Sequence, residues 1–283
     1  MANSLLGYQE GQGFFYQLSG ASKLLAFIFI SVACMISYDT RLLLFVGIAS
    51  SVLLYFSNIK WRQISFVVTV IAIFALLNVL MVYLFSPNYG ATIYGKSTVL
   101  IKGIGWYQLT SQELFYLFNL VLKYLCTTPL ALLFLVTTQP SQFASSLNRL
   151  GVSYKISYAV SLTLRYIPDV QEEFQMIKQS QQARGLELSS KGKLYERIKG
   201  NLRIIIPLIF SSLERIDTVS TAMELRRFGK EKKRTWYRAQ AMTTKDYLVI
   251  GISVFILALS IWLIVVNQGR FYNPWNYNRG TCF

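Results

Sequence analysis

The amino-acid sequence predicts an all-α integral membrane protein with about five transmembrane helices and a water-facing region of long amphipathic helices. Apolar residues make up 53% of the 283-residue chain and charged residues only 14%, which departs from the composition of soluble proteins. The charge is also segregated, because 19 of the 28 Lys and Arg lie between Arg149 and Lys245. Long uncharged stretches around one charged block are typical of a membrane bundle with a water-exposed insertion.

Five apolar windows each approach the roughly 20 residues that an α-helix needs to cross the hydrocarbon core of a bilayer. They cover residues 22–37, 42–57, 64–85, 114–136 and 247–266. The first two windows are separated only by Tyr-Asp-Thr-Arg at 38–41, which indicates a tight turn. We therefore expect an N-terminal membrane bundle of four spans at 1–136, an amphipathic-helix region at 137–245, and a final span with a short outer tail at 246–283.

Basic residues cluster at both ends of the 137–245 region, with Arg149 and Lys155 near its start and Lys230 and Lys245 near its end. Segments rich in Lys and Arg beside a membrane span stay in the cytoplasm. With five spans, this rule places the amphipathic region and the N-terminus in the cytoplasm, and the C-terminus outside the cell. The formal net charge of +15 then suits the cytoplasmic leaflet and acidic partners, and no nucleic-acid recognition module is visible.

One cation, Lys123, falls inside the fourth apolar window. Charges within a membrane are costly and often mark functional sites. The alternative is that Lys123 pairs inside the helix bundle or faces a bound partner. The sequence alone leaves both interpretations open.

The 86–113 loop contains a match to the Walker A pattern, from Gly90 through Gly95-Lys96-Ser97. A functional phosphate-binding loop follows a buried strand and precedes a helix in a parallel α/β domain. Here the match lies between two transmembrane windows, on the predicted outer side of the membrane. We therefore interpret it as a chance match and expect no nucleotide site there.

Catalytic, metal and cofactor sites are not expected in this chain. It contains no histidine, which removes imidazole acid-base chemistry and histidine-ligated metals. The cysteines Cys34, Cys126 and Cys282 are isolated and do not have the spacing of metal ligands. Several acids of the amphipathic region have helical spacing, which predicts solvated faces or pairs within one helix: Asp169, Glu172, Glu173, Glu214 and Asp217.

Two long helices are predicted in the amphipathic region, at about 153–183 and 194–227, after a short helix that starts at Pro140. Each long helix carries apolar residues at steps of three or four along one face. Each also contains a proline, Pro168 or Pro207, that follows an arginine closely and precedes a second arginine near the helix end. The two helices therefore resemble each other internally.

Both long helices end at an arginine. The first ends in Ala183-Arg184-Gly185, where glycine suits a left-handed cap and arginine suits the negative end of the helix dipole. The second ends in Leu225-Arg226-Arg227. An exposed guanidinium pairs with both oxygens of a carboxylate, so these ends are candidate docking points for an acidic groove. The simpler interpretation is that each arginine only caps its helix.

These residues resemble the transmembrane, or T, component of energy-coupling factor (ECF) transporters, the ATP-driven importers of vitamins and trace metals in prokaryotes. The similarity starts near Leu-Ser-Gly-Ala-Ser-Lys-Leu-Leu at 18–25 and is most specific at 137–229. The family has two Ala-Arg-Gly motifs, and the first is intact as Ala183-Arg184-Gly185. At the second, Ala-Met-Glu at 222–224 is kept, and Leu225-Arg226-Arg227 follows with Arg226 at the position of the motif arginine.

The resemblance implies a non-catalytic, energy-coupling subunit in the plasma membrane of a prokaryotic cell. Its two arginine motifs would insert into grooves of two cytoplasmic ABC-type ATPase subunits. A separate membrane-embedded S component would bind the transported vitamin or other micronutrient. Two other classes stay open: a stand-alone channel or secondary transporter, which needs a polar site at the bilayer midplane, and a membrane enzyme, which needs convergent titratable groups.

Overall fold

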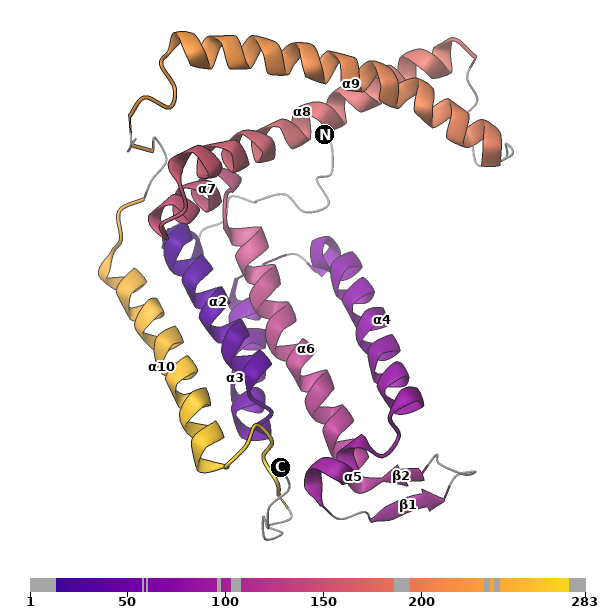
Figure 1. Cartoon of the computed structure of the whole chain (residues 1–283), viewed down its shortest axis with the longest axis vertical. Coiled ribbons are helices and arrows are strands. Elements are labelled where there is room, and N and C mark those ends of the chain that lie inside the picture. The colour runs from indigo at the N-terminus through magenta and orange to yellow at the C-terminus, as the bar shows by residue number, and fades with distance from the viewer. Residues whose placement is uncertain are drawn as a thin grey trace. The chain divides into compact units, whose positions relative to one another are not determined.

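The computed structural model describes residues 14–57, 59, 61–95, 98–102, 108–185, 194–231, 235–236 and 240–274 (Figure 1). Its helices are α1 (Phe14–Gln17), α2 (Gly20–Ile36), α3 (Thr40–Phe56), α4 (Trp61–Phe85), α5 (Tyr89–Tyr94), α6 (Ser111–Thr137), α7 (Pro140–Arg149), α8 (Tyr154–Ala183), α9 (Leu194–Leu225) and α10 (Thr244–Val266). Strands β1 (Val99–Lys102) and β2 (Gln108–Thr110) form a small antiparallel hairpin, which the sequence did not predict. The all-α membrane fold class is confirmed.

Three described helices, α4, α6 and α10, are long and apolar enough to cross a membrane. Helices α2 and α3 are also apolar but have 17 residues each. At a rise of about 1.5 Å per residue, 17 residues extend about 26 Å, slightly less than the roughly 30 Å of hydrocarbon. All five helices correspond to the predicted windows, and the number of five spans stays a prediction.

The chain divides into two compact units. The first, called the membrane unit below, comprises Met1–Gln139 and Gln240–Phe283. The second, called the polar unit, comprises Pro140–Ala239 and contains α7, α8 and α9. The membrane unit therefore joins α10 to the N-terminal helices, although the whole polar unit separates them in the sequence.

The centre of the membrane unit is built by α2, α3 and α6. Its buried core includes Cys34, Leu43, Val46 and Cys126, and both cysteines are free thiols. Gly47 of α3 allows α6 to approach closely, because a Cβ at this position would lie 3.3 Å from the Cys126 sulfur. Small residues at such contacts are typical of helix packing in membranes.

Lys123 is buried in the middle of α6. Its Nζ donates a hydrogen bond of 2.8 Å to the backbone carbonyl of Met35, near the end of α2. The same Nζ lies 3.2 Å from the centroid of the Tyr38 ring, where the aromatic face attracts a cation. Of the interpretations that the sequence left open, the structure supports pairing inside the helix bundle.

Asp246 joins the beginnings of α10 and α2. Its Oδ1 accepts hydrogen bonds from the Ser19 backbone N–H at 2.8 Å and from the Ser22 hydroxyl at 2.5 Å. Its Oδ2 accepts from the backbone N–H and the hydroxyl of Thr243, the N-cap of α10, at 2.8 and 2.9 Å. Two helices that are far apart in the sequence therefore begin at one buried carboxylate.

Gly90, the first residue of the Walker A match, has a role in helix packing. Gly90 lies inside α5, and its backbone N–H donates to the Glu113 carboxylate at 2.6 Å. A Cβ at Gly90 would lie 2.6 Å from the backbone of Gln112 and Glu113, so a larger residue would force α5 away from α6. The order of elements is helix and then strand, the reverse of a phosphate-binding loop, while Lys96 and Ser97 lie outside the described residues.

The segment after α10 returns to the turn between α2 and α3. Asn267 Nδ2 donates to Asp39 Oδ2 at 2.8 Å, and the Tyr38 N–H donates to the Arg270 carbonyl at 2.8 Å. The Phe271 ring lies 4.5 Å from the Tyr38 ring, centroid to centroid. The first residues of the predicted outer tail are therefore part of the packed end of the membrane unit.

In the polar unit, α7 begins at Pro140 as the sequence predicts. Helix α8 continues through Pro168, and α9 continues through Pro207. The last helical residue of α9 is Leu225, two residues before the predicted end of this helix. Helices α8 and α9 pack against each other, and Figure 1 shows them crossing.

Candidate functional site at two arginine tips

The first tip, defined as Ala183-Arg184-Gly185, closes α8. Ala183 is the last helical residue, and the Arg184 N–H donates to the Ser180 carbonyl at 3.2 Å. Gly185 has a φ of 85°, and its N–H donates to the Gln182 carbonyl at 3.0 Å. A left-handed residue just after a helix is common and favours glycine. All three residues of the first tip are exposed.

The second tip, defined as Leu225-Arg226-Arg227, closes α9 with the same backbone arrangement. The Arg226 N–H donates to the Ala222 carbonyl at 3.2 Å, and the Arg227 N–H donates to the Glu224 carbonyl at 2.8 Å. Arg227 has a φ of 53°, so it occupies the left-handed position. The Phe228 N–H donates to the Met223 carbonyl at 2.9 Å, which completes a Schellman motif.

These hydrogen bonds match the two tips residue by residue. Ala183 corresponds to Leu225, Arg184 to Arg226, and Gly185 to Arg227. Each tip therefore presents an arginine directly after the last helical residue, where the helix dipole favours a cation. Among the described residues, none of the three tip arginines forms an ion pair, so their charge faces solvent.

The tips differ in the residues on either side of this arginine. Leu225 is 81% exposed, whereas the first tip has only the methyl group of Ala183 at this position. Arg227 holds a left-handed conformation that costs a residue with a Cβ about 1–2 kcal/mol. The second tip is therefore bulkier and more basic than the first, and it stores backbone strain.

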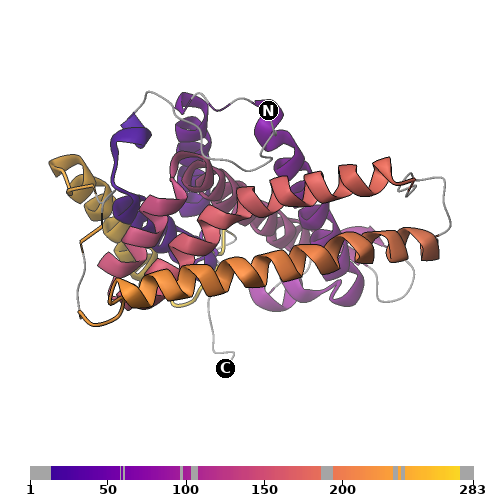
Figure 2. The same ribbon diagram turned by 90° about the horizontal axis from the view of Figure 1, so that it is seen from above.

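The two tips lie at opposite ends of the α8–α9 pair (Figure 2). Directly after the second tip, the Phe228 ring packs against Tyr154 and Tyr158 at the beginning of α8, with centroid distances of 5.7 and 4.7 Å. The first tip is at the other end of α8. The sequence pattern did not predict this contact of Phe228, although the two tyrosines four residues apart indicate an aromatic surface at the beginning of α8.

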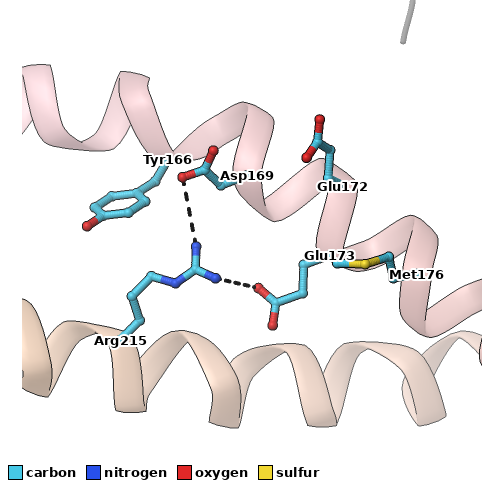
Figure 3. A pocket seen from close by; sticks show the side chains of 6 residues that line it. All are labelled: Tyr166, Asp169, Glu172, Glu173, Met176 and Arg215. Atoms are coloured by element: carbon cyan, nitrogen blue, oxygen red, sulfur yellow. Dashed lines mark hydrogen bonds and ion pairs between the residues drawn. The ribbon is translucent and has the colours of Figure 1, made fainter. Parts of the chain in front are cut away.

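Between the tips, α8 and α9 are joined by an ion pair that corrects one sequence-based prediction. Glu173 and Asp169 were expected on solvated faces or in pairs within one helix. Instead, Arg215 of α9 lies 3.1 Å from Glu173 and 4.0 Å from Asp169, both on α8 (Figure 3). Local helical spacing could not predict this pairing, because it depends on how the two helices are rotated toward each other.

An apolar groove of about 580 Å³ runs beside this ion pair. Its walls come from both helices, and they include Leu162, Ile167 and Val170 of α8 and Ile216, Val219 and Met223 of α9. In the described part of the chain, no three Cys, Asp or Glu side chains gather closely enough to hold a metal ion. The polar unit therefore offers exposed cations and apolar surface, which suit contacts with other proteins.

Comparison with known proteins identifies the same family as the sequence motifs do, and the similarity extends over most of the chain. The family model described as CbiQ, cobalt transport protein, matches residues 14–237. The chain is 28% identical over 273 residues to the energy-coupling factor transporter transmembrane protein EcfT of Streptococcus equi, which covers 95% of this chain and 98% of that protein. It is 26% identical over 250 residues to EcfT of Heliobacterium modesticaldum, covering 87% of this chain and 92% of that protein.

A further similarity is to a protein with a different name. The chain is 32% identical over 142 residues to a putative ABC transporter ATP-binding protein of Bifidobacterium longum, covering 47% of this chain but only 18% of that protein. The family model, in contrast, matches residues 14–237, and the two EcfT proteins match 87% and 95% of this chain. The chain thus belongs to the CbiQ cobalt transport protein family and is the transmembrane component of an energy-coupling factor transporter.

Proposed function

We propose that this chain is the scaffold that links two cytoplasmic ABC-type ATPase subunits to a membrane-embedded S component in an ATP-driven importer. The observation that carries the proposal is the pair of exposed arginine tips with one backbone geometry at opposite ends of two packed helices. Two tips with the same backbone arrangement suit two related ATPase subunits. Hydrolysis would occur in the ATPases, and the S component would bind the vitamin or other micronutrient.

The docking residues are Ala183, Arg184 and Gly185 at the first tip and Leu225, Arg226 and Arg227 at the second. An acidic groove on each ATPase would receive the arginine, because a guanidinium forms two parallel hydrogen bonds with a carboxylate. The small first tip allows close approach of the partner. The exposed leucine of the second tip requires an apolar wall beside the acids. The similarity to an ABC transporter ATP-binding protein supports partners of this class.

We propose that the S component binds the apolar face of α9. This face exposes a row of large residues whose exposed fractions are between 50% and 63%: Leu202, Ile206, Ile209, Phe210 and Leu213. Contiguous exposed apolar surface of this kind marks protein or membrane contacts. An S component embedded in the membrane would provide a protein contact and an apolar environment at the same time. We further propose that the N-terminus and the polar unit are cytoplasmic and the C-terminus extracellular, following the distribution of basic residues.

A stand-alone channel or secondary transporter is not favoured by any observation. Such a protein needs a polar site at the membrane midplane. The candidate for that role, Lys123, is engaged by the Met35 carbonyl and the Tyr38 ring. Its charge therefore serves helix packing.

Purification in mild detergent tests the proposed assembly. The tagged chain is expressed in the organism from which it comes, so that its natural partners are present. It is expected to co-purify with two ABC-type ATPase subunits and one small membrane protein. The control is the double variant Arg184→Glu with Arg226→Glu, which should insert into the membrane and lose both ATPases. Recovery of the chain without ATPases in its wild-type form, or with both of them in the double variant, would contradict the proposal.

Arg227→Gly is expected to stabilise the second tip and at the same time to lower its affinity for the ATPase. Glycine relieves a left-handed strain of about 1 kcal/mol, so amide hydrogen exchange in the last turn of α9 should slow by about fivefold. The variant also removes a charge from the docking surface, so binding of the ATPase should weaken by about tenfold or more, from the loss of a charged hydrogen bond.

The matched control is Gly185→Arg at the first tip, which introduces the same strain at a position where no atom of the described residues lies within 4 Å of the added Cβ. This substitution should speed exchange in the last turn of α8. Unchanged ATPase affinity in Arg227→Gly would show that Arg227 does not contact the partner.

A further inference from the structure

The α8–α9 crossing is fixed by one cation that reaches two carboxylates. Arg215 Nη2 lies 3.1 Å from Glu173 Oε2, and Arg215 Nη1 lies 4.0 Å from Asp169 Oδ2. The Ser211 hydroxyl, one turn earlier on α9, also donates to Glu173. Figure 3 shows the guanidinium between the two helices, with both acids pointing toward it. Three polar contacts therefore tie α9 to α8.

This cluster is shielded on one side. The side chain of Glu173 is only 16% exposed and that of Arg215 is 38% exposed. The Arg215 guanidinium also lies 5.7 Å from the centroid of the Tyr166 ring, on α8. Partly buried pairs are screened less by salt than surface pairs, and arginine keeps a fixed planar geometry. The pair is thus suited to hold one crossing geometry.

The position of the crossing is symmetric with respect to the tips. Glu173 precedes the first-tip Arg184 by eleven residues, and Arg215 precedes the second-tip Arg226 by eleven residues. At about 1.5 Å per helical residue, each tip lies about 16 Å along its helix from the ion pair. Because both tips are at the same distance from one fixed crossing, the angle at this crossing determines how far apart they are.

The structure assigns to Arg215 the role of a positioning residue that sets the spacing of the two docking tips, an inference that rests on the proposed function. Its pairing with Glu173 holds both tips at the separation that two joined ATPase subunits require. Simultaneous engagement of two sites increases the affinity only when the geometry permits it. Arg215 therefore contributes to ATPase binding without touching the ATPases.

A double-mutant cycle with purified full-length chain and its ATPase pair tests this role. In the wild-type background, Arg215→Ala should weaken binding of the ATPase pair by roughly 100-fold, the lower end of what bivalency adds. In an Arg226→Glu background only the first tip binds, so Arg215→Ala should have no further effect. If Arg215 only stabilised the structure of the first tip, Arg215→Ala would weaken binding equally in both backgrounds. That result would overturn the assignment.

Restoring the pair with reversed charges provides the rescue. Arg215→Glu with Glu173→Arg should recover tight binding when Asp169→Asn is also present, because the new glutamate would otherwise face Asp169. The matched control is Glu172→Gln. Glu172 lies next to Glu173 on α8 but points away from Arg215, so its loss should leave the affinity unchanged (Figure 3).

Spin labels give the spacing directly in the full-length chain. Gln179 and Thr221 are exposed, and each precedes its tip arginine by five residues. Labels on cysteines at these two positions, in a background in which the native cysteines are alanine, should report one narrow distance distribution. Arg215→Ala should broaden it, and the reversed pair should narrow it again. A narrow distribution in Arg215→Ala would overturn the assignment, whereas failure of even the wild-type chain to bind ATPases would instead contradict the proposed function.

Discussion

Arg184→Glu is expected to abolish ATP-dependent uptake while the chain still inserts into the membrane. The substitution reverses the charge of an exposed tip that would enter an acidic groove, and it places an anion at the unfavourable end of the α8 dipole. Removing one partner of a desolvated charge pair at an interface costs about 2–5 kcal/mol, which corresponds to at least a roughly thirtyfold loss of affinity. ATPase co-purification and ATP-driven uptake of the substrate of the co-purified S component measure the effect.

The matched control for this prediction is Lys178→Glu, a charge reversal on the same helix six residues before Arg184. It should insert, bind the ATPases and support uptake, because it leaves the tip and its cap intact. Arg226→Glu should weaken docking at the second tip in the same way as Arg184→Glu at the first. Normal uptake by Arg184→Glu would leave this arginine with only its capping role.

Asp246→Ala is expected to have the largest effect on stability. The carboxylate accepts four hydrogen bonds, two from Thr243 within the α10 cap and two from Ser19 and Ser22 of the α2 cap. Loss of a cap costs about 0.5–2 kcal/mol, and each buried donor left unsatisfied costs about 1–3 kcal/mol. We therefore expect a loss of about 3 kcal/mol or more in the free energy of unfolding.

The unfolding midpoint in detergent and the yield of monodisperse protein measure this loss. Asp246→Asn should have an intermediate effect, because its single carbonyl oxygen replaces only one of the two carboxylate oxygens. Asp217→Ala, at an exposed position on α9, serves as the control and should change the midpoint little. An unchanged midpoint in Asp246→Ala would mean that the two caps are stable independently of each other.

Much of the fold follows from local patterns. Apolar windows correctly gave α2, α3, α4, α6 and α10, because residues in lipid must satisfy their backbone groups within one helix. Pro140 and Gly185 correctly gave a helix start and a helix end, because each residue restricts or permits particular backbone angles. The end of α9 was placed too late. The cap forms at Arg227, where residue preference alone would favour a glycine such as Gly229.

What the sequence by itself determined is the five apolar helices, the helices α7, α8 and α9, and the arginines that end α8 and α9, since helical periodicity, capping and hydropathy act within a few residues. Only the tertiary structure decided which buried polar groups meet. Lys123 reaches Met35, Asp246 reaches Ser19, and Arg215 reaches Glu173 across helix interfaces. These pairs depend on the rotation and crossing of packed helices, which a one-dimensional pattern does not specify. The tips are therefore local features, while the spacing between them is a property of the packed fold.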